Sequence, residues 1–116
     1  MAVNSVLNLR IDQGSTFSQE ITVKDSSGDA FDLTGHTASA KMALGYSSTR
    51  TRVSMTATIN ADATTGKITL SLTADQTNSL DAPARYVYDV EILKTSDSTV
   101  TRVSEGIITT YPSVTT

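Results

Sequence analysis

Hydrophobic and polar residues alternate along most of this chain. A period of two places successive side chains on opposite faces of a β-strand. The alternation predicts strands on these apolar residues: Leu7, Leu9 and Ile11; Phe17, Ile21 and Val23; Ala38, Ala40, Met42 and Leu44; Val53, Met55, Ala57 and Ile59; and Ile68, Leu70 and Leu72. Two longer strands are expected from Arg85 to Lys94 and from about Thr99 to Thr110.

Turn signals separate these segments. Asp, Ser and Gly residues at 25–29, the corner Thr34-Gly35 and the segment 61–66 favour turns, because their side chains bond to nearby backbone and Gly accepts a positive φ. A single helical segment is expected. Thr73 and Gln76 have the spacing of a capping box, and the short helix should end near Leu80.

Seven or eight short strands separated by frequent turns are typical of a sandwich or barrel. Tyr86 lies at the start of a late strand, where immunoglobulin-like domains place a tyrosine that bonds to upstream backbone. Tyr88 then occupies the position of an antibody cysteine, although the alternative is that both tyrosines pack on one strand face. The pattern predicts an all-β, immunoglobulin-like antiparallel sandwich of about seven to eight strands with one short helical turn.

Length and composition narrow the class of protein. The 116 residues suit one domain, 1–116, with extended N- and C-terminal arms. The absence of cysteine excludes disulfides and thiolate metal sites. The N-terminal segment does not have the pattern of a signal peptide, and no apolar run has the about 20 residues that cross a bilayer, so no membrane is expected.

Net charge also limits the partners. The chain carries a formal charge of -3, and its densest basic cluster is only Arg50 with Arg52. Nucleic-acid-binding proteins concentrate Lys and Arg in a stripe or patch, so nucleic acid is not an expected partner.

No residue pattern indicates catalysis or a cofactor. His36 is the only histidine, which leaves a serine triad with a single candidate base, and no phosphate-binding glycine loop occurs. Asp25, Asp29 and Asp32 do not have the spacing of an EF-hand and fit ordinary turn chemistry. The sequence therefore predicts a protein that is not an enzyme and has no cofactor or metal.

Five ordered segments carry a resemblance to a known family. They are Ile11-Asp12-Gln13-Gly14-Ser15-Thr16-Phe17, Asp32-Leu33-Thr34-Gly35-His36-Thr37-Ala38, Gly66-Lys67-Ile68-Thr69-Leu70-Ser71-Leu72, Arg85-Tyr86-Val87-Tyr88-Asp89-Val90 and Arg102-Val103-Ser104-Glu105-Gly106. The chain resembles small bacteriophage virion proteins related to the N-terminal domain of phage baseplate upper proteins, which also occur at the start of tail-fibre proteins. The resemblance covers nearly the whole chain. It departs from the family at His36, where members often have an aromatic residue.

The resemblance implies a multicopy, non-enzymatic virion protein, made in the host cytoplasm. Its partners are expected to be other virion proteins (tail, baseplate, fibre or capsid subunits), in a homo-oligomeric or symmetric assembly. A connector at the tail, baseplate or fibre base is favoured over a capsid decoration (cement) protein. A surface adhesin or carbohydrate-binding module is a further alternative, disfavoured because exposed aromatic residues are few.

Candidate contact residues lie in three segments that are expected to be flexible and to become ordered against a neighbouring subunit. These are the leading arm (1–5), the polar loop from Gly45 to Arg52 and the tail from Thr110 to Thr116. The individual interaction candidates are Tyr46, Arg50, Arg52, Tyr111, Pro112 and Val114.

Overall fold

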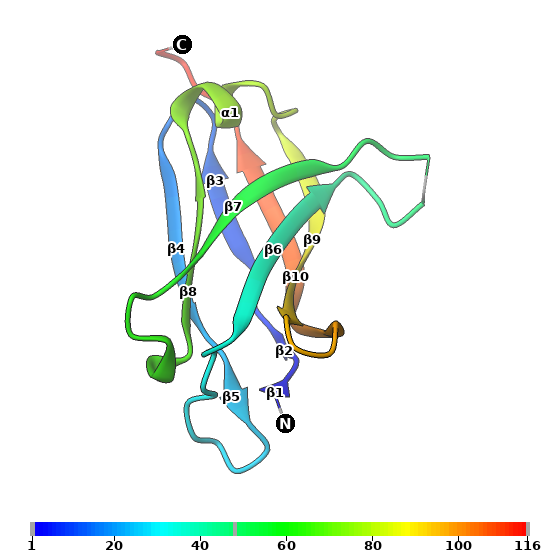
Figure 1. Cartoon of the computed structure of the whole chain (residues 1–116). Helices are drawn as coiled ribbons and strands as arrows, with labels where there is room; N and C mark the ends of the chain where they lie inside the picture. The colour runs from blue at the N-terminus through cyan, green and yellow to red at the C-terminus, as the bar shows by residue number, and fades with distance from the viewer. Residues whose placement is uncertain (1, 48, 116) are drawn as a thin grey trace.

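A computed structural model describes residues 2–47 and 49–115 (Figure 1). The strands are β1 (Ala2–Val3), β2 (Ser5–Val6), β3 (Leu9–Asp12), β4 (Phe17–Thr22), β5 (Lys24–Asp25), β6 (His36–Ala43), β7 (Val53–Ile59), β8 (Lys67–Leu72), β9 (Ala84–Lys94) and β10 (Thr99–Tyr111). A 3₁₀ helix, η1 (Ala63–Thr65), and an α-helix, α1 (Ala74–Asn78), complete the described elements.

The strands form two packed layers that share β7. In one layer β3 pairs with β10, followed by β9, β6 and the first part of β7. In the other layer the second part of β7 pairs with β8, which pairs with β4. In chain order this gives the B, E and D strands of an immunoglobulin domain in one sheet and the C, F and G strands in the other. The predicted all-β, immunoglobulin-like sandwich is confirmed.

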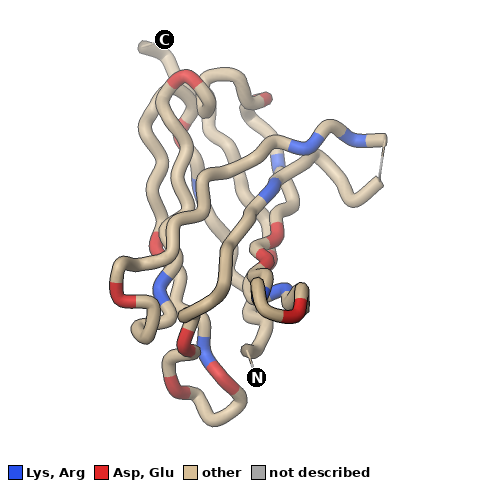
Figure 2. Tube along the Cα trace, viewed as in Figure 1, with Lys and Arg blue, Asp and Glu red and all other residues tan. Residues whose placement is uncertain are grey.

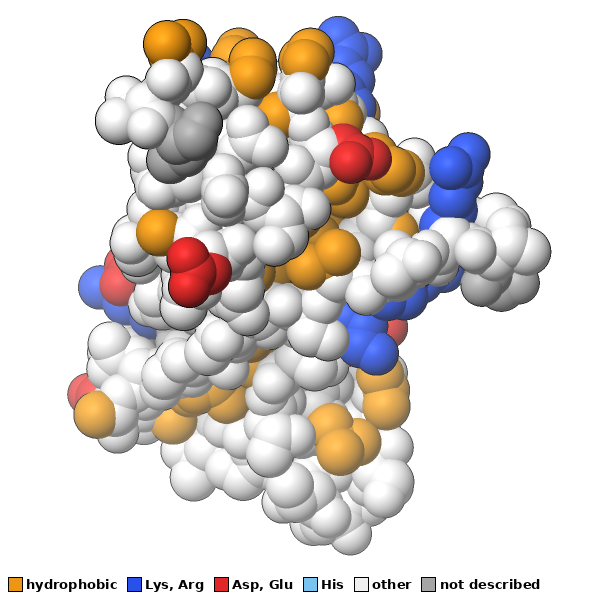
Figure 3. Space-filling model, turned by 90° about the horizontal axis from the view of Figure 1, so that it is seen from above, with side chains coloured by type: hydrophobic (Ala, Val, Ile, Leu, Met, Phe, Trp, Pro, Cys, Tyr) orange, Lys and Arg blue, Asp and Glu red, His pale blue; other side chains and the backbone are white. Residues whose placement is uncertain are grey.

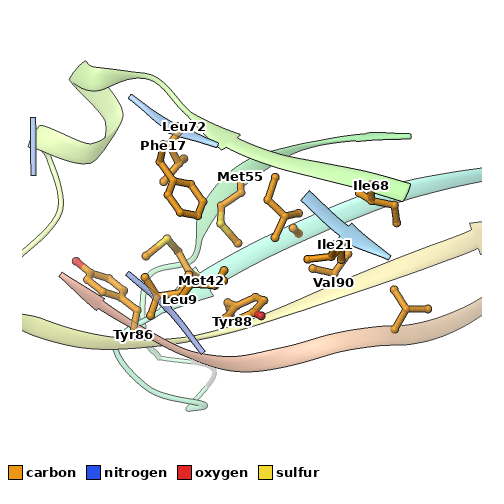
Figure 4. Close-up of a cluster of buried hydrophobic side chains, with 14 of the residues drawn as sticks. Leu9, Phe17, Ile21, Met42, Met55, Ile68, Leu72, Tyr86, Tyr88 and Val90 are labelled. Carbon is orange, nitrogen blue, oxygen red and sulfur yellow. The ribbon is translucent and has the colours of Figure 1, made fainter. Parts of the chain in front are cut away.

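The core fills the space between the two layers. Alternate residues of β8 and β9, which lie in opposite layers, are buried, as the period of two requires. Phe17 and Ile21 of β4 and Met55 of β7 are buried with them. Figure 4 shows Phe17 and Leu72 from one layer, and Met55 from the shared strand β7, meeting Leu9, Tyr86 and Tyr88 from the other layer. Ile68, Leu70 and Val90 have no exposed surface, so the core-facing sides of β8 and β9 are fully packed.

Two apolar residues that were expected within strands lie outside them and are exposed. Leu7 and Leu44 are 38% and 40% exposed, because each lies just beyond the strand that was expected to contain it. At Leu7 the chain passes between β2 and β3 very close to Gly106 of β10, where an added Cβ would lie 2.3 Å from the Leu7 carbonyl oxygen. The Leu7 amide also donates to the Glu105 carbonyl at 2.9 Å, so the backbone of Leu7, rather than its side chain, is held against the sheet.

The corner tyrosine is confirmed. Tyr86 is 5% exposed, and its hydroxyl oxygen accepts a hydrogen bond from the Asp81 amide at 2.8 Å. The neighbouring inward residue, Tyr88, donates from its hydroxyl to the Leu7 carbonyl at 2.5 Å. Burial raises the pKa of both phenols above the ordinary tyrosine value.

The capping box is also confirmed. The Thr73 hydroxyl accepts from the Gln76 amide at 3.2 Å, and the Gln76 side chain accepts from the Thr73 amide at 2.8 Å. The helix ends at Asn78, somewhat before the expected Leu80. Its one fully buried residue, Thr77, donates to the Ser15 carbonyl and accepts from the Gly14 amide, so it joins α1 to the β3–β4 turn.

At the end of the sandwich opposite α1, backbone hydrogen bonds join three connections: the one between β4 and β6, the one between β7 and β8, and the one between β9 and β10. They run from the Val23 amide to the Gly66 carbonyl at 2.7 Å, from the Leu33 amide to the Ala63 carbonyl at 2.9 Å and from the Thr95 amide to the Gly35 carbonyl at 3.0 Å. The turns expected at 25–29, Thr34-Gly35 and 61–66 are all present here. His36, where the resembled family often has an aromatic residue, packs edge-on against Phe31 with ring centroids 5.5 Å apart.

Both chain ends are engaged by the sheets. Within the leading arm, Ala2–Val3 pairs with β5 and Ser5–Val6 runs parallel to β10, while Met1 lies outside the described residues. At the other end β10 continues through Tyr111, and Thr110 is only 1% exposed. The tail beyond the sheet therefore begins at Pro112, and Thr116 lies outside the described residues.

Candidate interaction surface

The two outer faces of the sandwich differ in chemistry. On the β4–β8–β7 sheet, the strand register places Ser18, Ser71 and Thr56 in one row. The next row is Glu20, Thr69 and Thr58. Across the described residues of these rows the outer face is hydroxyl-bearing and charged, which is the usual composition of a solvated sheet face.

The outer face of the β3–β10–β9–β6 sheet carries an apolar row. Ala43, Val87 and Ile107 are register partners across β6, β9 and β10. Ile107 is 39% exposed and Val87 is half-buried, whereas Ala43, at the end of β6, is buried. The neighbouring residues of these strands that face the core are also apolar. At these positions β6, β9 and β10 therefore carry apolar residues on both faces, whereas a solvated face normally carries polar residues. We call this set, with the residues flanking it, the outer row.

Polar rows border the outer row on both sides. One contains Lys41, Asp89 and Glu105. Asp89 also forms an ion pair with Arg102 at 3.4 Å. The other contains Arg85, Thr109 and Arg10. An apolar centre with a polar and charged rim is the arrangement found in protein–protein interfaces.

Tyr111 lies on the same face, at the margin formed by β3. The Arg10 guanidinium stacks over its ring, 3.8 Å from the centroid, and also pairs with Asp12 at 3.0 Å. The ring is 41% exposed. The stacking fixes a planar aromatic–guanidinium pair at the edge of the sheet, a combination enriched at the energetic centres of interfaces.

Tyr46 and Arg52 form the opposite margin. The Arg52 guanidinium donates to the Gly45 carbonyl at 3.1 Å and to the Tyr46 carbonyl at 3.2 Å, so it closes the base of the β6–β7 loop. The Tyr46 side chain is 74% exposed. Both residues line a small cleft of about 80 Å³ whose wall includes Ala43 and Val87. The loop therefore continues the outer row.

Arg50 lies in a different hollow, on the other side of the same loop. This groove, of about 390 Å³, is bounded by Leu44 and Val53 on the loop side and by Asp81 and Tyr86 on the body side. Figure 3 shows hydrophobic side chains between the loop and the body of the molecule. The predicted pair Arg50 and Arg52 is thus divided between two surfaces.

Pro112 and Val114 are exposed on the tail, where Val114 retains its full accessible surface. The amide of Ser113 donates to the Gln13 side chain at 3.3 Å, which anchors the tail near the β3–β4 turn. Of the six predicted contact residues, the structure therefore places Tyr46, Arg52 and Tyr111 on one face, Arg50 beside it and two on the tail.

The sequence analysis did not identify Ala43, Val87 and Ile107. One signal in the sequence could have identified Val87. It lies between two inward-facing tyrosines, so the strand has three consecutive hydrophobic residues and one of them must face outward. Ile107 similarly precedes the buried Ile108. Only the strand register brings the three outward residues into one row.

The described residues offer little metal-binding or membrane-spanning chemistry. Within residues 2–47 and 49–115, no three His, Cys, Asp or Glu side chains gather in a way that could hold an ion. The Asp25 carboxylate instead accepts from the Ser27 and Asp29 amides. None of the helices in the same residues is long and apolar enough to cross a membrane.

Comparisons with known proteins add little. No family model matches the sequence, and no curated protein matches it. Among solved structures, the filamin domain of Lin-41 is similar, with a TM-score of 0.40 and 16% identity over 81% of each chain. At this level the similarity carries no information about function.

Proposed function

We propose that this chain is a non-enzymatic structural protein of a bacteriophage virion. It acts as a multicopy connector at the tail, baseplate or fibre attachment region. The resemblance of its five ordered segments to phage baseplate and tail-fibre domains supplies the setting. The outer row supplies the means, because the protein binds its neighbours through that sheet face.

The difference between the two outer faces is the observation that supports this proposal. A protein that only needed to be soluble could have hydroxyl-bearing residues on both faces, as β4, β8 and β7 have. Instead one face carries an apolar row, with an Arg–Tyr stack at one margin and an exposed tyrosine at the other. Repeated in a symmetric particle, a modest contact of this size adds up to a stable attachment.

The location is tested by immunogold labelling of purified particles, read by electron microscopy. Label confined to the tail or its tip is expected. Label spread over the head instead favours the alternative of a capsid decoration protein. Particles without label refute the virion assignment.

The role of the outer row is tested with two substitutions that add the same charge on opposite faces. Ile107→Glu places a carboxylate in the outer row, whereas Thr58→Glu places one on the hydroxyl-bearing face. Particles grown with Ile107→Glu should contain less of the protein than particles grown with Thr58→Glu, at equal expression and equal thermal stability. Equal incorporation of the two variants would remove the outer row from the proposal.

A further inference from the structure

Charge is distributed unevenly along this chain. Residues 33–61 contain no Asp or Glu, but they contain Lys41, Arg50 and Arg52, although the whole chain has a formal charge of -3. This acid-free segment consists mainly of β6, β7 and the loop between them. Figure 2 shows these blue positions gathered on the projecting part of the molecule.

The shape of this segment makes its charge accessible. β6 and β7 pair through three register positions, from Ala40 opposite Met55 to Met42 opposite Val53. Beyond them the loop extends away from the body of the sandwich (Figure 1). A hollow lies on each side of it, with Ala43 bordering one and Leu44 bordering the other. We call residues 41–47 and 49–53 the basic hairpin.

The opposite end of the sandwich has the complementary chemistry. Its three hydrogen-bonded connections carry five aspartates: Asp25, Asp29, Asp32, Asp62 and Asp97. Lys24, Lys67 and Lys94 also lie there, but Lys67 is paired with Glu20 at 3.8 Å. Figure 2 shows the red turn positions concentrated at this end. We call it the acidic end.

The acidic end also presents aliphatic side chains. Val3 and Val100 are 45% and 58% exposed, and Leu93, the register partner of Val100, is 36% exposed. The carboxylates of the acidic end complement the positive charge of the basic hairpin, and its exposed aliphatic residues complement the apolar hollows beside the hairpin.

We propose that the basic hairpin of one copy docks on the acidic end of a second copy of this chain. The inference rests on the multicopy assembly proposed above and names one of its contacts. Because the two surfaces are different, the contact is heterologous: it joins copies head to tail and closes into a ring or continues as a filament. The outer row remains free for other subunits.

The expected strength decides how the contact is to be measured. Exposed ion pairs contribute little free energy each, so an isolated pair of copies associates weakly. The Debye length is about 20 Å at roughly 0.02 M salt and about 4 Å at roughly 0.5 M, so low salt favours the contact and high salt removes it. In a particle, many such contacts act together.

Sedimentation velocity of the whole chain at up to about 1 mM measures the association, near the affinity expected for a contact of a few kcal/mol. The wild type should sediment faster with concentration at low salt and as a monomer at high salt. Two charge variants with the same net charge separate this contact from general repulsion. Lys41→Glu with Arg50→Glu alters the basic hairpin, whereas Lys24→Glu with Lys94→Glu makes the acidic end more acidic.

The first variant should remain a monomer at low salt, and the second should associate at least as strongly as the wild type. A third variant, Asp29→Lys with Asp97→Lys, should be monomeric alone but should associate when mixed with the hairpin variant, because the reversed charges match again. Circular dichroism checks that each variant is folded.

A wild type that stays monomeric at low salt overturns this contact, and so does equal association of the two variants with the same net charge. Particle labelling is independent of this result. Labelled particles with no head-to-tail association leave the virion role in place, whereas unlabelled particles refute the role itself.

Discussion

Gly66 combines a left-handed backbone conformation with close backbone neighbours, so a single methyl group there should be costly. It ends η1 with a φ of 70°, a conformation that side-chain-bearing residues rarely adopt. A Cβ there would lie 2.6 Å from the Val23 carbonyl oxygen and 3.0 Å from the Phe31 carbonyl oxygen. Both neighbours are backbone atoms, so neither can rotate away. The Gly66 carbonyl also accepts from the Val23 amide, which fixes its own position.

The cost of Gly66→Ala has two parts. Placing alanine in the left-handed region costs about 1–2 kcal/mol. Forcing a methyl group into close-packed backbone adds about 1–3 kcal/mol, because the strands must shift. Gly28 isolates the first part, since it has a φ of 87° with nothing within 4 Å of an added Cβ. Gly28→Ala should therefore cost only about 1–2 kcal/mol.

Urea unfolding followed by circular dichroism measures both variants. With a slope of about 1–2 kcal/mol per molar urea for a chain of this size, the contact cost of about 1–3 kcal/mol should place the Gly66→Ala midpoint about 0.5–3 M below the Gly28→Ala midpoint. The slopes should be equal, because neither change alters the surface exposed on unfolding.

Equal midpoints for the two alanine variants would refute the reasoning. They would mean that the backbone around Gly66 relaxes without cost, and hence that the three connections are not rigidly joined. A Gly28→Ala variant as unstable as expected for Gly66→Ala would show that the φ cost, rather than the contact, dominates.

Three further outcomes follow from buried or hydrogen-bonded groups. Burial raises the pKa of Tyr86 and Tyr88, so the native state keeps phenol protons that the unfolded chain loses above about pH 10. Stability should be full below that pH and fall above it, and Tyr88→Phe should reduce the fall in urea midpoints. Thr77→Val should cost about 1–3 kcal/mol in thermal unfolding, because it removes two part-buried hydrogen bonds, to the Ser15 carbonyl and from the Gly14 amide; a cost below about 0.5 kcal/mol would contradict this. Hydrogen bonds from the Thr34 hydroxyl and amide lower the pKa of Asp32, so its contribution is present above about pH 4 and is lost as the pH falls; Asp32→Asn should flatten the acid side of the stability curve.

Local patterns predicted most of the secondary structure. The capping box depends on residues three apart, and the turns depend on Gly and Asp side chains bonding within a few residues, so a linear reading identifies them. The corner tyrosine was also accessible, because Tyr86 bonds only five residues upstream. Leu7 was misplaced because its environment depends on Gly106, nearly 100 residues away.

The candidate surface was only partly predictable for the same reason. Exposed polar segments pointed to Tyr46, Arg52 and Tyr111, but they also pointed to Pro112 and Val114, which lie apart on the tail. Nothing in a linear pattern says which of two apolar neighbours in a strand faces outward.

The order of residues was enough to define an all-β sandwich, its turns and its acid-free segment, because these depend on alternation, short-range hydrogen bonds and composition. The three-dimensional arrangement alone decided that Ala43, Val87 and Ile107 form one row, and that the aspartates of three separate connections lie together opposite the basic hairpin. Both are consequences of strand register, which pairs residues far apart in the chain and is set by packing of the whole core.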